Sequence, residues 1–210
     1  MPRITALEPD PRRPGALRLV VDGKVFCTVH EDAPVRGLAV GAEWDQPRQA
    51  DAGQAADEEG AWRAALRSLE RRNFAVAELR RRLQQKGHPP AAVDYAIGRA
   101  QAAGLVDDAA FARRFVESRS ARGRGPARLR RDLQALGVDR RHIEAALAAQ
   151  WETQDDALPI ARELAARRLR QLAGVPSDVR RRRVLAYLAR RGFSGSRVSE
   201  LVTQLMRAKS

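Results

Sequence analysis

The sequence predicts a mainly α-helical protein: a tandem array of three three-helix units, preceded by a small N-terminal domain that contains a β-hairpin. The main observation is one apolar pattern that occurs three times. Its copies are Leu79, Leu83, Gly87, Val93 and Ile97; Leu129, Leu133, Gly137, Ile143 and Leu147; and Val184, Leu188, Gly192, Val198 and Val202. The glycines lie 50 and 55 residues apart, a period typical of stacked helical units that cannot bury their apolar faces alone.

The other observations are the charge and the cysteine content. The net charge is +13, and residues 1–58 contribute −3 of it while residues 59–210 contribute +16. A field of that sign favours a polyanion or an acidic protein as the partner. The single cysteine, Cys27, excludes an internal disulfide framework and a cysteine-based zinc site. Without a signal peptide or a long apolar run, we expect a soluble, cytoplasmic protein with no membrane association.

Residues 1–45 are expected to form the small β-rich domain. Two β-rich runs, Ala16 to Val21 and Lys24 to Val29, flank the dipeptide Asp22-Gly23. Both residues of this dipeptide accept the positive φ of a tight type I′ turn, so the runs predict a hairpin.

A hairpin needs a further strand or a helical cover to be stable. The segment from Arg3 to Leu7 is the expected third strand, and the segment from Val35 to Trp44 is expected to add a short helix or strand. In the simplest hairpin register, Leu19 faces Phe26.

A linker is expected over residues 46–59, which are rich in Asp, Gln, Ala and Gly and show no periodicity. The three helical units then span residues 60–105, 106–152 and 153–210. The expected helices are 61–72, 76–86 and 90–103; 108–122, 126–135 and 140–150; and 156–173, 177–190 and 195–207.

Capping residues agree with this division. Each repeat glycine stands where a helix must end, because glycine adopts the left-handed conformation without a steric penalty. Asp139 and Ser194, each two residues after a repeat glycine, are predicted N-caps. The pairs Asp107-Asp108 and Asp155-Asp156 also precede helices. Paired carboxylates can serve as acid/base catalysts or metal ligands, but this position favours capping of free N–H groups.

Motifs of enzymes are absent from the sequence. There is no GxxxxGK[ST] loop, no HExxH, no GxSxG and no Cys/His spacing suited to a metal. The histidines His30, His88 and His142 are far apart and do not share a repeat position. We therefore expect no catalytic residues, no metal and no cofactor, and an enzyme with an unrecognised site is the third and weakest hypothesis.

Arginines that recur between units are the candidate binding residues. In the second unit a pair recurs at the position of Arg80 and Arg81, and in the third a run of four arginines lies further upstream. A solvated face is the alternative interpretation, but adjacent arginines repel one another and favour an anionic partner. The predicted partner- or DNA-binding face consists of Arg80, Arg81, Arg113, Arg114, Arg119, Arg124, Arg128, Arg130, Arg131, Arg180, Arg181, Arg182 and Arg183.

Several segments resemble the RecX family of RecA regulators. They include Glu78-Leu79-Arg80-Arg81-Arg82-Leu83, Gly104-Leu105-Val106-Asp107-Asp108 and Gly123-Arg124-Gly125-Pro126. The similarity covers about residues 62 to 149 and is looser in the third unit. Ala75 departs from the family, which usually has Ser or Thr there as a helix cap, and this puts the start of that helix in question.

The resemblance implies tandem three-helix units and a non-catalytic protein that binds the RecA filament on single-stranded DNA. Such a protein restrains ATP hydrolysis, strand exchange and the co-protease activity behind the SOS response, and so acts in DNA repair and recombination. The alternative is a general single-stranded DNA-binding protein that competes for DNA. The expected partners are the RecA filament and single- or double-stranded DNA, bound by a monomer.

Overall fold

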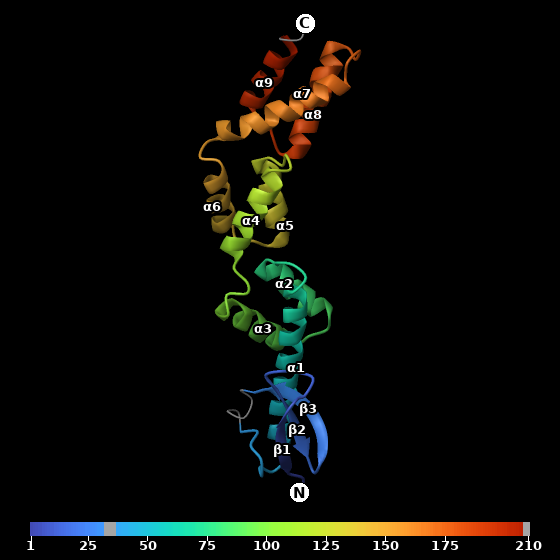
Figure 1. The fold of residues 1–210 in the computed structure, drawn as a ribbon, viewed down its shortest axis with the longest axis vertical. Helices are drawn as coiled ribbons and strands as arrows, with labels where there is room; N and C mark the ends of the chain where they lie inside the picture. Colours follow the sequence, from blue (N-terminus) through green and yellow to red (C-terminus); the bar gives the residue numbers. More distant parts are fainter. Residues whose placement is uncertain (32–36, 208–210) are drawn as a thin grey trace. The chain divides into compact units, whose positions relative to one another are not determined.

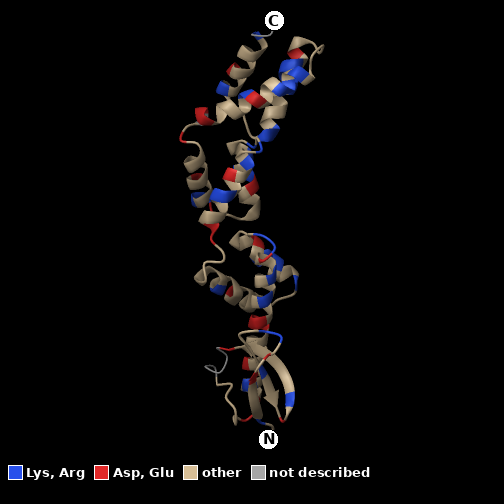
Figure 2. Cartoon of the chain, viewed as in Figure 1, with Lys and Arg blue, Asp and Glu red and all other residues tan. Residues whose placement is uncertain are grey.

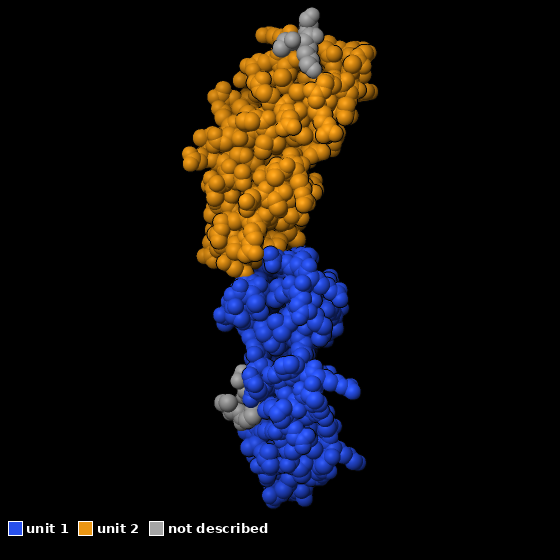
Figure 3. Space-filling model, in the orientation of Figure 1, with its two compact units in different colours: residues 1–106 blue, residues 107–210 orange. Residues whose placement is uncertain are grey.

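The fold was analysed in a computed structural model, which describes residues 1–31 and 37–207. The chain divides into two compact units, Met1–Val106 and Asp107–Ser210 (Figure 3). An N-terminal three-stranded antiparallel sheet is followed by helices in groups of three, which confirms the predicted fold class (Figure 1).

The sheet consists of β1 (Ile4–Pro9), β2 (Ala16–Val21) and β3 (Lys24–His30), in that order and antiparallel. In the turn between β2 and β3, Asp22 has φ 46° and Gly23 has φ 78°. These two positive φ angles are those of the predicted hairpin turn, and β1 is the predicted third strand.

The predicted register is wrong at one pair. Leu19 lies opposite Cys27, and Val20 lies opposite Val25. The register shift between Leu19 and Val20 marks a bulge, which leaves Phe26 without a partner on β2. The Phe26 ring instead meets the ring of Trp44 edge-on, with 4.8 Å between centroids.

The segment expected to form a helix or strand from Val35 to Trp44 lies partly outside the described residues, which resume at Gly37. From Gly37 the chain forms turns, and Glu43 makes an isolated bridge with Arg3. Residues 37–44 therefore form neither a helix nor a strand of the sheet.

The expected linker over residues 46–59 is wrong, because these residues form the first part of α1 (Gln46–Leu69), a helix of 24 residues. The Asp45 side chain caps it by accepting a hydrogen bond from the backbone N–H of Arg48, at 3.0 Å. Pro47 occupies the first turn, where its missing N–H costs nothing. Asp45 and Pro47 mark the start of the helix in the sequence. This signal was missed in the sequence analysis because the segment after these residues is rich in Asp, Gln, Ala and Gly.

Helix α1 contributes to two apolar cores. Ala52 and Ala55 lie in the core formed with the sheet, beside Leu19 and Val29. Further along, the alanines Ala61, Ala64 and Ala65 belong to the core of the first three-helix unit. The helix therefore joins the sheet and the first three-helix unit into one compact body.

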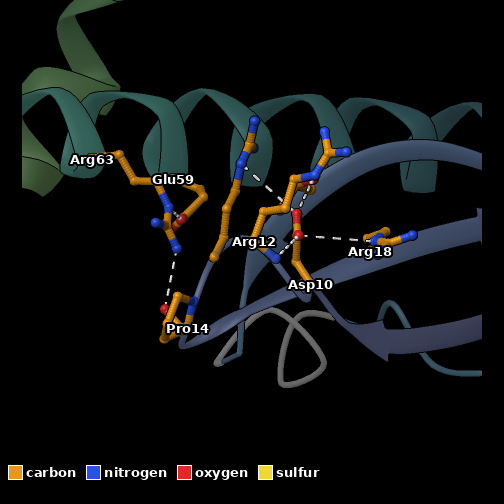
Figure 4. A network of polar contacts seen from close by, with 8 residues as sticks. Asp10, Arg12, Pro14, Arg18, Glu59 and Arg63 are labelled. Carbon is orange, nitrogen blue, oxygen red and sulfur yellow. Dashed lines mark hydrogen bonds and ion pairs between the residues drawn. The ribbon is translucent and has the colours of Figure 1, made fainter.

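Two buried carboxylates explain why the periodicity of α1 is weak in the sequence. Glu58 and Glu59 are only 6% and 2% exposed, at positions where an amphipathic pattern would have apolar residues. Glu59 is paired with Arg63, which also donates to the Pro14 carbonyl at 3.1 Å (Figure 4). This polar contact ties α1 to the connection between β1 and β2.

Asp10 organises the same connection. It accepts a hydrogen bond from the backbone N–H of Arg12 at 2.9 Å, and the guanidinium of Arg18 lies 4.0 Å away (Figure 4). The bond from Arg12, helped by the nearby charges of Arg18 and Arg13, lowers the pKa of Asp10. The carboxylate thus stays ionised and holds the connection in place.

The remaining helices agree with the predicted ones to within two residues at each end. They are α2 (Val76–Gln85), α3 (Pro90–Ala102), α4 (Asp108–Ser120), α5 (Pro126–Leu136), α6 (Arg140–Gln150), α7 (Leu158–Gln171), α8 (Ser177–Arg191) and α9 (Ser196–Arg207). A 3-10 turn, η2 (Gln154–Ala157), precedes α7. In each group of three, the first helix packs against the third.

The aspartates predicted as caps are confirmed, whereas Ser194 is not the residue before α9, which starts at Ser196. Asp107 and Asp139 accept hydrogen bonds from N–H groups in the first turns of α4 and α6, and Asp156 accepts one from the Thr153 N–H at the start of η2. The bonds to Asp107, first of all from Ala110, lower its pKa. Helix α2 begins at Val76 without a side-chain cap, as the alanine before it requires.

The repeat glycines end their helices with φ between 85° and 96°, as predicted. Gly192 has a second role, because a Cβ built there would lie 2.4 Å from the backbone nitrogen of Arg128, which is too close for a side chain. A Cβ on Gly125 would lie 2.6 Å from the Gly192 oxygen, and the Gly125 N–H donates to the Arg191 carbonyl at 2.8 Å. Glycine at both positions lets the second and third three-helix units meet backbone to backbone.

Substitutions at Gly53 test whether residues 46–59 form a helix or a linker. Nothing lies within 4 Å of a Cβ built on Gly53, so an added side chain meets no steric clash there. In a helix, Gly53→Ala should stabilise the protein by about 0.5–1 kcal/mol, and Gly53→Pro should destabilise it by about 3 kcal/mol or more. Chemical denaturation of both variants measures these changes. If neither substitution changed the free energy of unfolding, residues 46–59 would be a linker after all.

At Gly125 the close backbone approach predicts a steric cost. Gly125→Ala should destabilise the protein by about 1–3 kcal/mol, because the added methyl group forces apart the two units that meet there. Gly98→Ala is the matched control, since it lies within α3 with nothing within 4 Å of the added Cβ. Thermal unfolding compares them, and equal melting temperatures for the two variants would contradict the predicted contact.

Candidate basic binding surface

Positive charge is greatest in the third three-helix unit. Residues 60–105 hold 9 Lys or Arg against 3 Asp or Glu, residues 106–152 hold 10 against 7, and residues 153–210 hold 13 against 5. Figure 2 shows many of the Lys and Arg of this last unit along α8. The net charge of each unit therefore depends on its carboxylates as much as on its arginines.

An arginine and a carboxylate form the same ion pair in the first two units. Arg130 on α5 donates two hydrogen bonds to Glu144 on α6, both of 2.7 Å. Fifty residues earlier, Arg80 on α2 pairs with Asp94 on α3. Each pair joins the second helix of its unit to the third and neutralises an arginine of the predicted face.

The pair shifts the protonation equilibria of its members. The hydrogen bond from Arg130 lowers the pKa of Glu144, and that from Glu144 raises the pKa of Arg130. Both side chains therefore remain ionised at physiological pH.

The third unit lacks this pair. Leu185 stands at the repeat position of Arg80, and Ser199 stands at that of Asp94. Arg181, one turn earlier on α8, donates to the Ser199 hydroxyl at 2.8 Å. A neutral hydroxyl stands in place of the carboxylate, so this arginine is oriented, and no ion pair is found for it in the described part of the chain.

Three other predicted site residues also have partners within the chain. Arg128 pairs with Asp132 at 2.9 Å, and Arg124 pairs with the same carboxylate. Arg119 stacks on the Phe115 ring, 3.8 Å from its centroid. Burial, helped by the charge of Arg124, lowers the pKa of Arg119.

The rest of the predicted face is more accessible. Six arginines of it are exposed, namely Arg81, Arg113, Arg114, Arg131, Arg182 and Arg183, and Arg181 is exposed beside Ser199. Arg131 bonds to the Ala127 carbonyl of its own helix at 3.3 Å. The Arg180 side chain is half-buried, and its Nε has no hydrogen-bond partner among the described residues. Of the predicted arginines, the structure thus shows Arg80, Arg124, Arg128 and Arg130 in ion pairs with carboxylates of the chain.

One cationic cluster was missed by the sequence analysis. Burial lowers the pKa of Lys86, and the charges of Arg82, Arg67 and Arg71 lower it further. Burial and the Lys86 charge likewise lower the pKa of His88. The available signal was a pair of cations four residues apart at the end of each of two neighbouring helices, Arg67 and Arg71 at the end of α1 and Arg82 and Lys86 at the end of α2, but the cluster does not recur in the other units.

Chemically, the surface is suited to binding anions. Burial raises the pKa of the Cys27 thiol to about 11, so the thiolate that would act as a nucleophile is scarce. Within residues 1–31 and 37–207 there is no group of three or more His, Cys, Asp or Glu that could hold a metal ion. No helix in that part of the chain is long and apolar enough to cross a membrane.

Removing the Glu144 carboxylate should have a small, pH-dependent cost. Because the two side chains are 39% and 41% exposed, Glu144→Gln should lower the free energy of unfolding by only about 0.5–1 kcal/mol near neutral pH. The lowered pKa means that this contribution is present above the unfolded-state pKa and is lost as the pH falls through the folded-state pKa. Urea denaturation at several pH values measures it.

The exposed Glu117, for which no ion pair is found among the described residues, gives the control Glu117→Gln. A Glu144→Gln effect that was the same at acidic and neutral pH would contradict the ionic origin of the contribution.

Comparisons with known proteins agree with the repeat division. Models of the first, second and third three-helix domains of RecX match residues 61–99, 107–147 and 154–202. The regulatory protein RecX of Thermobifida fusca is 38% identical over 69% of this chain and 77% of its own length. That of Halorhodospira halophila is 38% identical over 64% of this chain and 81% of its own length.

Solved structures show the same fold. A crystal structure of regulatory protein RecX matches 97% of this chain and 100% of its own, with a TM-score of 0.82 and 24% identity. RecX from Lactobacillus salivarius matches 72% and 97%, with a TM-score of 0.63 and 18% identity. The fold, the three matched domains and the identity to curated relatives together show that this chain belongs to the RecX family.

Proposed function

We propose that this protein is a regulator that binds the RecA filament formed on single-stranded DNA and lowers its ATPase, strand-exchange and co-protease activities. The observation that carries the proposal is the match of all three helical units to RecX domains. The relatives are named regulatory proteins, which supports a regulatory role in place of a catalytic one. In this role the protein acts by binding and makes no covalent change.

The charge distribution supports the third unit as the main contact with the filament. Arg182 and Arg183 are exposed on α8, and no carboxylate partner for either is found among the described residues. A nucleoprotein filament carries the negative charge of its DNA, so it attracts such a surface. By contrast, Arg80 and Arg130 already have carboxylate partners and gain less from an external anion.

Cosedimentation with RecA filaments formed with a slowly hydrolysed nucleotide tests this proposal. The double substitution Arg182→Gln/Arg183→Gln should weaken binding about tenfold, from the loss of roughly 1.4 kcal/mol of charge interaction. The matched control Arg80→Gln/Arg130→Gln removes the same charge from ion-paired positions and should change filament binding less.

RecA ATPase titration separates the proposal from its alternative, competition for DNA. A filament regulator inhibits while free DNA sites are still in excess over the protein. If inhibition required enough protein to cover the free DNA, the protein would be a general single-stranded DNA-binding protein. If the Arg80/Arg130 control lost more binding than the Arg182/Arg183 variant, the wrong surface would have been chosen.

A further inference from the structure

A second cationic feature is a pocket within the unit Asp107–Ser210. It has a volume of about 580 Å³ and lies between the turn that follows α4 and one face of α7 and α8. Four arginines line it, Arg122 from the turn, Arg167 and Arg168 from α7, and Arg191 from α8, together with a single carboxylate, Glu163. None of these arginines belongs to the face predicted from the sequence.

Neutral partners hold two of these guanidinium groups in place. Arg191 donates to the Arg122 carbonyl at 3.2 Å, and Arg168 donates to the Gln171 side chain at 3.0 Å. The same two arginines lie over the Tyr187 ring, 5.3 and 5.7 Å from its centroid. The groups are thus oriented by a carbonyl, an amide and an aromatic face.

The pocket has little negative charge, because Glu163 is the single carboxylate of its lining. Among the described residues, no ion pair within 4 Å is found for any of its four arginines, whereas Arg128 and Arg130 of α5 are paired with acids. In addition, the Nε of Arg168 is buried without a hydrogen-bond partner. A buried, charged donor that lacks an acceptor costs about 1–3 kcal/mol, which a bound anion would recover.

We infer that this pocket binds the phosphate backbone of a nucleic-acid strand. Planar guanidinium groups match phosphate oxygens in forked pairs, and backbone phosphates are the main source of affinity for a strand. The inference goes beyond the proposed function, because it requires the protein to bind DNA at this pocket in the absence of RecA.

The number of cations favours phosphates over a carboxylate of an acidic peptide. Inside this chain one forked contact from Arg130 satisfies Glu144. Four arginines around one pocket exceed what a single carboxylate needs, and the Glu163 carboxylate on the pocket wall offsets only one of them. Successive phosphates of a strand place several negatively charged oxygens close together. An acidic peptide, by contrast, would also bring side chains that the pocket would have to accommodate.

The position of the pocket gives the bound strand a structural effect. Its lining comes from both the second and the third three-helix units, near the close approach of Gly125 to the Gly192 backbone. A phosphate held by Arg122 and Arg191 together would bridge the two units. Binding should therefore raise the melting temperature of the full chain.

Binding of a labelled single-stranded oligonucleotide to the full chain at several salt concentrations tests the inference. Arg122→Gln/Arg167→Gln removes the two exposed arginines of the pocket and spares those stacked on Tyr187. It should weaken binding and reduce the slope of log affinity against log salt by about 1.4, roughly 0.7 for each phosphate of the single strand that the variant no longer neutralises. The matched control Arg162→Gln changes an exposed arginine on the opposite side of α7 and should leave the slope within about half a unit of the parent.

Three results would overturn the inference. One is an unchanged slope in the Arg122/Arg167 variant while circular dichroism shows the parent fold. Another is stabilisation by inorganic phosphate that the variant abolishes without any loss of oligonucleotide affinity, which would assign the pocket to free phosphate. The third is polyglutamate that binds the pocket as tightly as the oligonucleotide, which would assign it to an acidic protein.

Discussion

The ion pair between the second and third helices of a unit decides where this protein presents positive charge. In the first two units it joins neighbouring helices and consumes an arginine, as Arg130 and Glu144 show most clearly. In the third unit Ser199 stands in place of the carboxylate, and Arg181 retains its charge beside it. The first two units therefore neutralise an arginine at this junction, whereas in the third unit the arginine meets a neutral hydroxyl.

A second constraint acts on the N-terminal half of the chain. Helix α1 supplies alanines to the core of the sheet and to that of the first three-helix unit. Because one rigid element serves both cores, the sheet cannot reorient without breaking the first unit. The buried pair of Glu59 with Arg63 adds a polar contact to the same junction. The sheet is therefore best understood as an integral part of the first compact unit.

Apolar spacing and caps made most of the helices predictable, because leucine and glycine positions report directly on helical period and termination. The pattern failed at α1, where alanines give a weak apolar stripe and two buried carboxylates interrupt it. The site was less predictable. Arg80 and Arg182 look alike in sequence, but the carboxylate that pairs with Arg80 lies on another helix, so only the fold distinguishes a paired arginine from an exposed one. Pairing across 14 residues, as in Arg80 with Asp94, leaves no local signal.

The most direct test of this account is to restore the missing carboxylate by Ser199→Glu and to measure filament binding against salt concentration. The hydroxyl of Ser199 is 2.8 Å from the Arg181 guanidinium, so a glutamate there can form the pair found in the other units. The account predicts weaker binding and a shallower salt dependence, equal to those of Arg181→Gln. Binding as tight and as salt-dependent as that of the parent protein would show that uncompensated charge on the third unit does not carry the interaction.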